Sequence, residues 1–79
     1  RKPAPWALEQ IMAQFSLPAS ELLMVDDLKP GYDMARAARV DFAAAGWAYD
    51  VPEIEAFMRK NCDFYFKTVQ EFGTFLEED

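Results

Sequence analysis

The sequence predicts an α/β domain in which helices alternate with the strands of a parallel sheet. Three short runs have the composition of buried strands: the fully apolar Leu22 to Val25, the mostly apolar residues 40–45 and the aromatic residues 64–66. Each run is followed by a segment with apolar residues at helical spacing. Because strand–helix–strand units require parallel strands joined by right-handed crossovers, the pattern favours one open parallel sheet.

The first helix is expected from about Pro5 to Phe15. Proline suits the first helical position, where its missing N–H costs nothing. Leu8, Ile11, Met12 and Phe15 then repeat at the spacing of one helix face.

The first strand and the second helix should follow a short loop at residues 16–20. The strand is expected at Leu22 to Val25, and two acids come directly after it. Pro30 and Gly31 are expected to turn the chain into a helix over Tyr32 to Arg39. The alanines of that helix would let it approach the sheet closely.

The second half of the chain should contain two further strands and two helices. Val40 to Ala45 is expected as a buried strand, although alanine is a poor strand former. Asp50 is the expected N-cap of the third helix, which should end near Lys60 with an apolar stripe at Ile54, Phe57 and Met58. After an aromatic strand at residues 64–66, Thr68 and Glu71 match a capping box. They would open a last helix with Val69, Phe72, Phe75 and Leu76 facing inward.

The resulting αβαβαβα order predicts a partial, three-layer Rossmann-like parallel sheet. Leu22 to Val25 is apolar at every position, which is typical of a central strand with neighbours on both sides. Only one neighbour is obvious here, and an uncovered apolar edge would invite aggregation. We therefore expect an N-terminal strand outside these 79 residues. The start without methionine, close to a helical pattern, also suggests a piece of a larger protein.

Composition limits the chemistry that the chain can support. The 79 residues make one small domain, and the net charge of −6 with only eight Lys and Arg argues against nucleic acid as a partner. No apolar run reaches the roughly 20 residues that span a bilayer. A single cysteine and no histidine exclude an internal disulfide and any Cys–His or Ser–His pair within this chain. Carboxylates and lysines remain, and we expect a reducing, cytoplasmic location.

Asp26 and Asp27 are the candidate site. Ligands of open parallel sheets gather at the carboxyl ends of the strands, where these two acids fall. Two carboxylates a few ångströms apart repel each other, and a shared proton, a nearby cation or a metal ion relieves the repulsion. Alternatively, the two acids simply cap the helix that follows them.

Several of these features together resemble a known family. Lys2-Pro3 comes just before the first expected helix, a strand ends in Asp26-Asp27, and Gly31 and the alanine-rich residues 35–38 follow. This order resembles the C-terminal half of the core domain in the haloacid dehalogenase superfamily, especially its phosphoglycolate-phosphatase-like and β-phosphoglucomutase-like members. In that family a Lys-Pro is the third motif, and a strand ending in Asp-Asp or Gly-Asp is the fourth. The resemblance covers nearly all of residues 1–79.

The resemblance implies a Mg²⁺-dependent phosphatase that acts on a phosphorylated small molecule through an aspartyl-phosphate. It implies Lys2 as the catalytic cation that offsets the charge of the phosphate, and Asp26 and Asp27 as Mg²⁺ ligands, directly or through water. The family's nucleophile lies in an Asp-x-Asp motif, which this sequence lacks. We therefore expect the missing N-terminal half of the same protein to supply the nucleophile and the substrate-selecting cap. This chain alone should be inactive.

Two other classes of protein are compatible with the acidic pair. Receiver-like signalling modules also place paired acids after an apolar strand, with a phosphoacceptor aspartate on a later strand, here Asp41 or Asp50. In receivers, however, the lysine follows the pair, whereas Lys2 precedes it. The other class is a non-catalytic αβ fragment, in which the acids are helix caps and an exposed strand edge binds the missing half.

Overall fold

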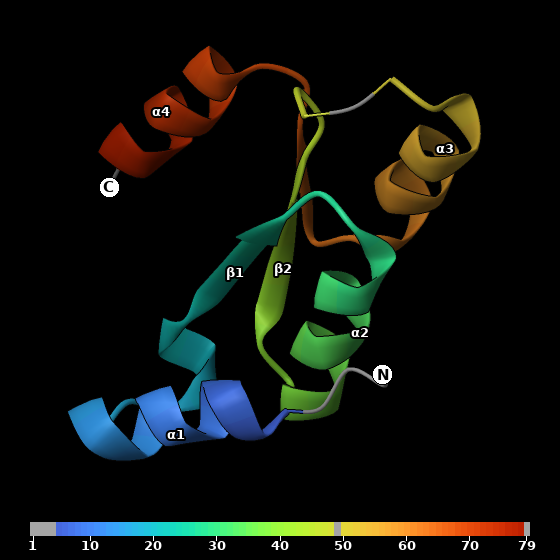
Figure 1. Cartoon of the computed structure of the whole chain (residues 1–79). Helices are drawn as coiled ribbons and strands as arrows, with labels where there is room; N and C mark the ends of the chain where they lie inside the picture. Colours follow the sequence, from blue (N-terminus) through green and yellow to red (C-terminus); the bar gives the residue numbers. More distant parts are fainter. Residues whose placement is uncertain (1–4, 49, 79) are drawn as a thin grey trace.

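The computed structural model describes residues 5–48 and 50–78, and helices alternate with strands throughout (Figure 1). The predicted αβαβαβα order is confirmed. The elements, in chain order, are α1 (Trp6–Phe15), the short 3₁₀ helix η1 (Ala19–Glu21), β1 (Leu23–Asp26), α2 (Lys29–Ala38), β2 (Asp41–Ala45), α3 (Pro52–Asn61), β3 (Phe64–Phe66) and α4 (Val69–Glu77).

The three strands form one parallel sheet in the order β1-β2-β3. Met24 lies opposite Phe42 in the register of β1 and β2, and Ala44 lies opposite both Asp26 and Tyr65. The central strand is therefore β2. By contrast, β1 has β2 as its one described neighbour, and Val25 is 37% exposed. The central position that we expected for this strand requires a further neighbour, which stays a prediction.

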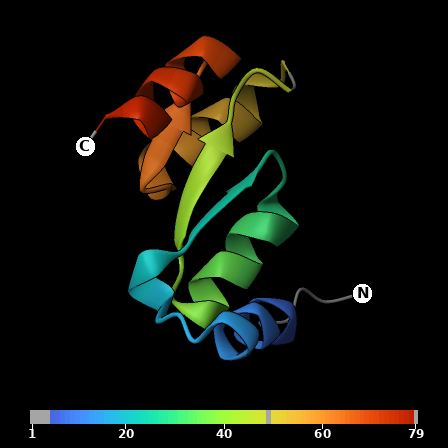
Figure 2. The same cartoon turned by 90° about the vertical axis from the view of Figure 1, so that its left-hand side faces the viewer.

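The helices flank the sheet on both faces (Figures 1 and 2). Two successive crossovers that advance in the same direction with the same hand place their helices on the same face. Accordingly, α2 and α3 share one face, with α2 against β1 and β2 and α3 against β3, whereas α4 packs on the opposite face of β3. The result is an open three-layer α/β arrangement.

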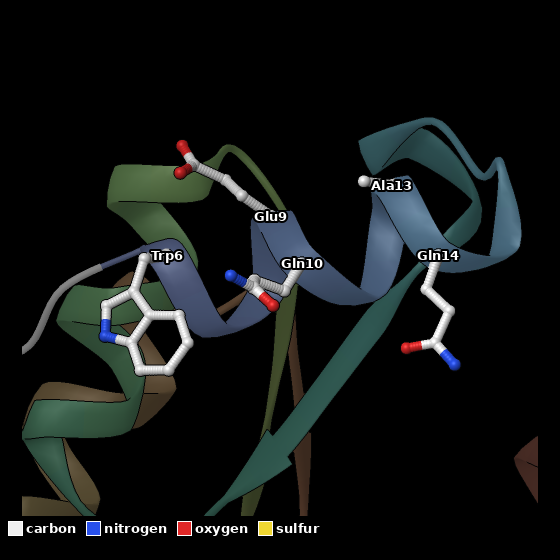
Figure 3. Close-up of a pocket in the computed structure, with 5 residues that line it drawn as sticks. All are labelled: Trp6, Glu9, Gln10, Ala13 and Gln14. Atoms are coloured by element: carbon white, nitrogen blue, oxygen red, sulfur yellow. The ribbon is translucent and has the colours of Figure 1, made fainter.

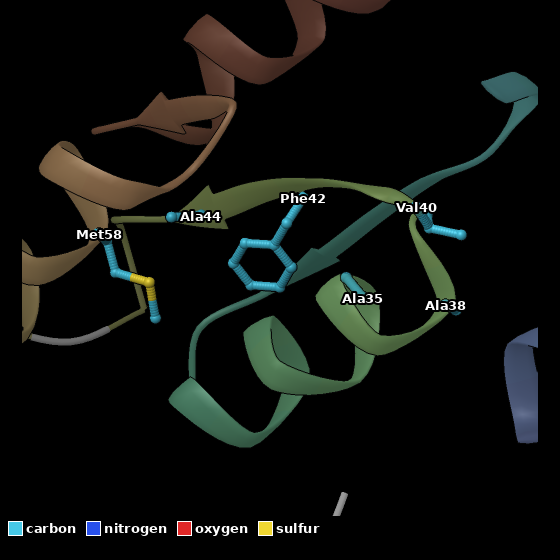
Figure 4. Close-up of a cluster of buried hydrophobic side chains, with 6 residues drawn as sticks. All are labelled: Ala35, Ala38, Val40, Phe42, Ala44 and Met58. Carbon is cyan, nitrogen blue, oxygen red and sulfur yellow. The ribbon is translucent and has the colours of Figure 1, made fainter. Parts of the chain in front are cut away.

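The core lies between β2 and the helices on the α2 side of the sheet (Figure 4). Phe42 and Met58 are fully buried, and the ring of Tyr32 meets the ring of Phe42 edge-on at a centroid distance of 5.7 Å. Alanine is a poor strand former, yet β2 forms because its small side chains let layers pack closely on both faces. The buried cluster consists of Ala35, Ala38, Val40, Phe42, Ala44 and Met58.

Aromatic side chains fill the space between β3 and α4. The ring of Phe75 lies 4.8 Å from the ring of Phe64 and 5.2 Å from that of Phe66, between centroids. The predicted inward stripe of this helix is only half right, because Val69 is 51% exposed and Leu76 is 61% exposed. A helix that packs chiefly on a three-residue edge strand can bury only one narrow row of side chains.

The helix α1 is also less buried than its pattern predicts. Leu8 and Met12 pack against the core cluster, as expected. Ile11 and Phe15 belong to the same predicted stripe, but they are 42% and 62% exposed. The apolar stripe of α1 is therefore only partly covered by the described residues.

Two of the predicted helix starts are wrong. The second helix begins at Lys29 rather than Tyr32, because Pro30 fits its first turn instead of breaking it. Gly31 consequently lies inside α2 and not in a turn. The third helix begins at Pro52 with Val51 as its N-cap and no capping side chain, so Asp50 lies one residue too early to serve as the cap.

The predicted capping box before α4 is present in altered form. Thr68 is the N-cap, and its hydroxyl accepts a hydrogen bond from the Glu71 N–H at 3.1 Å. The Glu71 carboxylate accepts from the N–H of Lys67 at 2.9 Å, one residue before the usual partner. Two backbone donors are still satisfied, so the physical role of the motif is retained.

A charged contact ties α2 to the segment that leads into β3. One carboxylate oxygen of Asp63 accepts hydrogen bonds from the guanidinium of Arg36 and from the Phe42 N–H, both at 2.9 Å. Arg36 also donates to the backbone carbonyl of Asn61 at 2.8 Å. Partial burial alone would raise the pKa of Asp63, but these two donors lower it below its usual value of 3.8. Asp63 is therefore held in its ionised form.

We predict that Asp63→Asn destabilises the fold by roughly 1–2 kcal/mol at neutral pH, because a charged acceptor of two hydrogen bonds is lost. A lowered pKa means that this contribution is present above the usual pKa of 3.8 and disappears as the pH falls through the lower folded value. Urea unfolding at several pH values measures the effect. The difference between wild type and variant should shrink on acidification. Asp50→Asn, an exposed control, should change stability little, and an equal loss in both variants would contradict the account.

Candidate metal-binding site

Asp26 and Asp27 lie at the carboxyl end of the sheet, where the sequence predicted them. Asp26 is the last residue of β1 and pairs with Ala44 of β2, so the strand runs one residue further than expected. Asp27 follows directly, and both residues are partly buried. Met24 packs into the core on the α2 side of the sheet, and strand alternation places Asp26 on the same side.

The Asp26 side chain is held between its own strand and the first turn of α2. Its Oδ1 atom accepts a hydrogen bond from the Asp27 N–H at 2.6 Å. On the other side it lies against Gly31, where an added Cβ would overlap the carboxylate. The N-terminal end of a helix carries a partial positive charge that favours a carboxylate. The absence of a side chain at position 31 is therefore what allows Asp26 to approach α2.

The ionised form of Asp26 is disfavoured in this position. Burial raises the pKa of Asp26 above its usual value of 3.8, and the nearby Asp27 carboxylate raises it further, although the backbone N–H of Asp27 acts in the opposite sense. The two carboxylates therefore interact as an acidic pair. A shared proton or a bound cation would relieve their repulsion.

Neither acid is the N-cap residue of α2. That residue is Leu28, and its own side chain makes no capping hydrogen bond. The alternative that Asp26 and Asp27 merely cap the following helix is thus not supported by the hydrogen bonds. Some interaction other than capping must therefore stabilise the two neighbouring carboxylates at this edge of the sheet.

The donor chemistry of the pair fits a hard cation such as Mg²⁺. This ion is commonly bound through one or two carboxylates and keeps several water molecules or substrate oxygens as its other ligands. Within the described part of the chain, no group of three or more acidic, histidine or cysteine side chains forms a larger cluster. Asp26 and Asp27 would therefore supply two ligands at most, and the remaining positions would have to come from elsewhere.

Cys62 does not contribute to this site. It lies in the connection before β3, and its sulfur is 3.4 Å from the sulfur of Met58 in the core. Burial raises the pKa of the Cys62 thiol to about 11, so that at neutral pH it is protonated and a poor nucleophile. The expectation that carboxylates and lysines supply the chemistry of this chain is unaffected.

Lys2 lies outside the described residues, so its predicted catalytic role stays a prediction. The described chain begins just before α1, which lies across the end of α2 that leads into β2 (Figures 1 and 2). The acidic pair lies at the other end of α2, beside its first turn. The described elements thus do not bring the start of α1 close to Asp26.

Lys29 is the described cation nearest in sequence to the acidic pair. Its ammonium group forms an ion pair with Asp33 at 3.1 Å and lies 5.6 Å from the centre of the Phe57 ring. Both members of the pair are well exposed, at 60% and 40% of their side-chain surface. This exposed contact indicates a surface role for both residues.

The two candidate phosphoacceptors of a receiver-like module lie in different places. Asp41 is the first residue of β2, at the amino-terminal edge of the sheet and opposite to the acidic pair. Asp50 is exposed in the loop before α3. Since a receiver requires the acceptor beside the paired acids, the position of Asp41 argues against that role.

A shallow hollow is present on the exposed face of α1 (Figure 3). All of its lining residues come from this one helix: Trp6, Glu9, Gln10, Ala13 and Gln14. No second element closes it, and α1 lies at the opposite end of the sheet from Asp26. It contributes nothing to the acidic site.

Comparison of the chain with protein-family models, curated proteins and solved structures finds no match. In the described part of the chain, no helix is both long enough and apolar enough to cross a membrane. The acidic pair Asp26 and Asp27 and the residues around it are therefore the features that point to a function.

We predict that Gly31→Ala destabilises the protein by roughly 1–3 kcal/mol, because the new methyl group displaces the Asp26 carboxylate. Alanine otherwise favours a helix over glycine by about 1 kcal/mol. Gly73→Ala in α4 is a matched control, since nothing lies within 4 Å of its added Cβ, and it should stabilise the protein.

Urea unfolding of a double-mutant cycle tests the assignment. In an Asp26→Ala background, Gly31→Ala should cost much less than in wild type, because most of the overlapping atoms are gone. If the cost is the same in both backgrounds, the contact between Gly31 and Asp26 is not its cause.

Proposed function

We propose that this chain supplies the metal-binding half of a phosphoryl-transfer site in a Mg²⁺-dependent phosphatase similar to the haloacid dehalogenase superfamily. The parent protein would hydrolyse a phosphoric monoester through an aspartyl-phosphate. The observation that best supports the proposal is the position of Asp26 and Asp27, two interacting carboxylates at the carboxyl end of β1. This chain contains no Asp-x-Asp motif, so the nucleophile would belong to another part of the protein.

The chemistry of the acidic pair suits this task. Phosphoryl transfer depends mainly on positioning and on neutralising the charge of the phosphate oxygens, which is what a bound Mg²⁺ supplies. Asp26 and Asp27 would bind the ion. The Asp27 N–H and Gly31 fix the position of the Asp26 carboxylate beforehand, so little ordering is left for the binding step.

The cost of burying the pair is consistent with a binding role. A carboxylate whose pKa is raised by burial and by a second acid destabilises the fold when it is ionised. Groups of this kind are concentrated at functional sites. A cation bound between the two carboxylates would attract both of them and offset their mutual repulsion. Cation binding would thereby compensate for the cost of placing two acids together at this position.

The proposal includes the partners expected from the sequence. The substrate would be a phosphorylated small molecule, and the missing N-terminal half of the same protein would place its nucleophile beside the acidic pair. Lys2 would provide the cation that offsets the charge of phosphate and nucleophile, which requires the start of α1 to lie nearer to the acidic pair than it does among the described elements. The proposed location is the cytoplasm, without a nucleic-acid or membrane partner.

We predict that the chain binds Mg²⁺ weakly, with a dissociation constant on the order of millimolar, because only two carboxylates are available. Calorimetric or NMR titration of the folded chain measures it. Asp26→Asn and Asp27→Asn should each weaken binding by about tenfold or more, as loss of a direct charged ligand requires. Circular dichroism verifies that both variants remain folded.

Asp33→Asn is the matched control for this titration. It removes the same charge from the neighbouring helix, but its partner is Lys29 and not the acidic pair. The Mg²⁺ affinity of Asp33→Asn should remain within about twofold of wild type, because loss of one negative charge outside the acidic pair has little effect on binding. Equal losses in all three variants, or no binding by wild type, would favour the non-catalytic αβ fragment.

We also predict that the 79 residues alone do not hydrolyse p-nitrophenyl phosphate in the presence of Mg²⁺. The reason is the missing nucleophile, since metal binding by itself does not provide the aspartyl-phosphate step. A colorimetric assay with and without chelator measures this. Robust Mg²⁺-dependent hydrolysis that disappears in Asp27→Asn would contradict the proposed division of the site.

A further inference from the structure

We draw no further inference here: the strongest candidate, the outer edge of β1 at Val25 together with the exposed apolar side chains of α1 at Ile11 and Phe15, carries none because nothing among the described residues shows what covers it.

Discussion

The contact of Asp26 with the first turn of α2 determines how the candidate site is built. Its carboxylate is held by the Asp27 N–H on one side and lies against Gly31 on the other. A side chain at position 31 would separate β1 from α2 or displace the acid. The same close approach contributes to the burial that raises the pKa of Asp26, and the neighbouring Asp27 carboxylate raises that pKa further.

The sheet around this contact has two different edges. On the β3 side the strand is only three residues long, and Lys67, which follows it directly, pairs with Glu55 of α3 at 3.5 Å. A strand this short offers few backbone groups for further pairing. On the β1 side, Leu23 to Val25 are apolar, Val25 is 37% exposed, and Asp26 is the one charged residue of the strand. The exposed apolar side chain on this strand agrees with the hypothesis that a further strand belongs beside β1.

Much of the fold could be predicted from the sequence because local patterns dictate it. The three strands and four helices follow from apolar periodicity, and even the alanine-rich β2 was recognisable from its continuous apolar run. Details that depend on packing were missed: Pro30 inside α2, and the exposure of Val69 and Leu76. For the site, the positions of Asp26 and Asp27 were predictable, but the role of Gly31 was not, because it depends on how closely a strand and a helix approach in space.

In the proposed site, Asp26 and Asp27 form an interacting pair whose repulsion a divalent cation would relieve. An NMR titration of the side-chain carboxyl resonance of Asp26, with and without Mg²⁺, tests this most directly. Without the ion, its pKa should lie above the usual 3.8, and saturating Mg²⁺ should lower it, since a bound cation favours the ionised form. A pKa at or below 3.8 that does not respond to Mg²⁺ would contradict the claim.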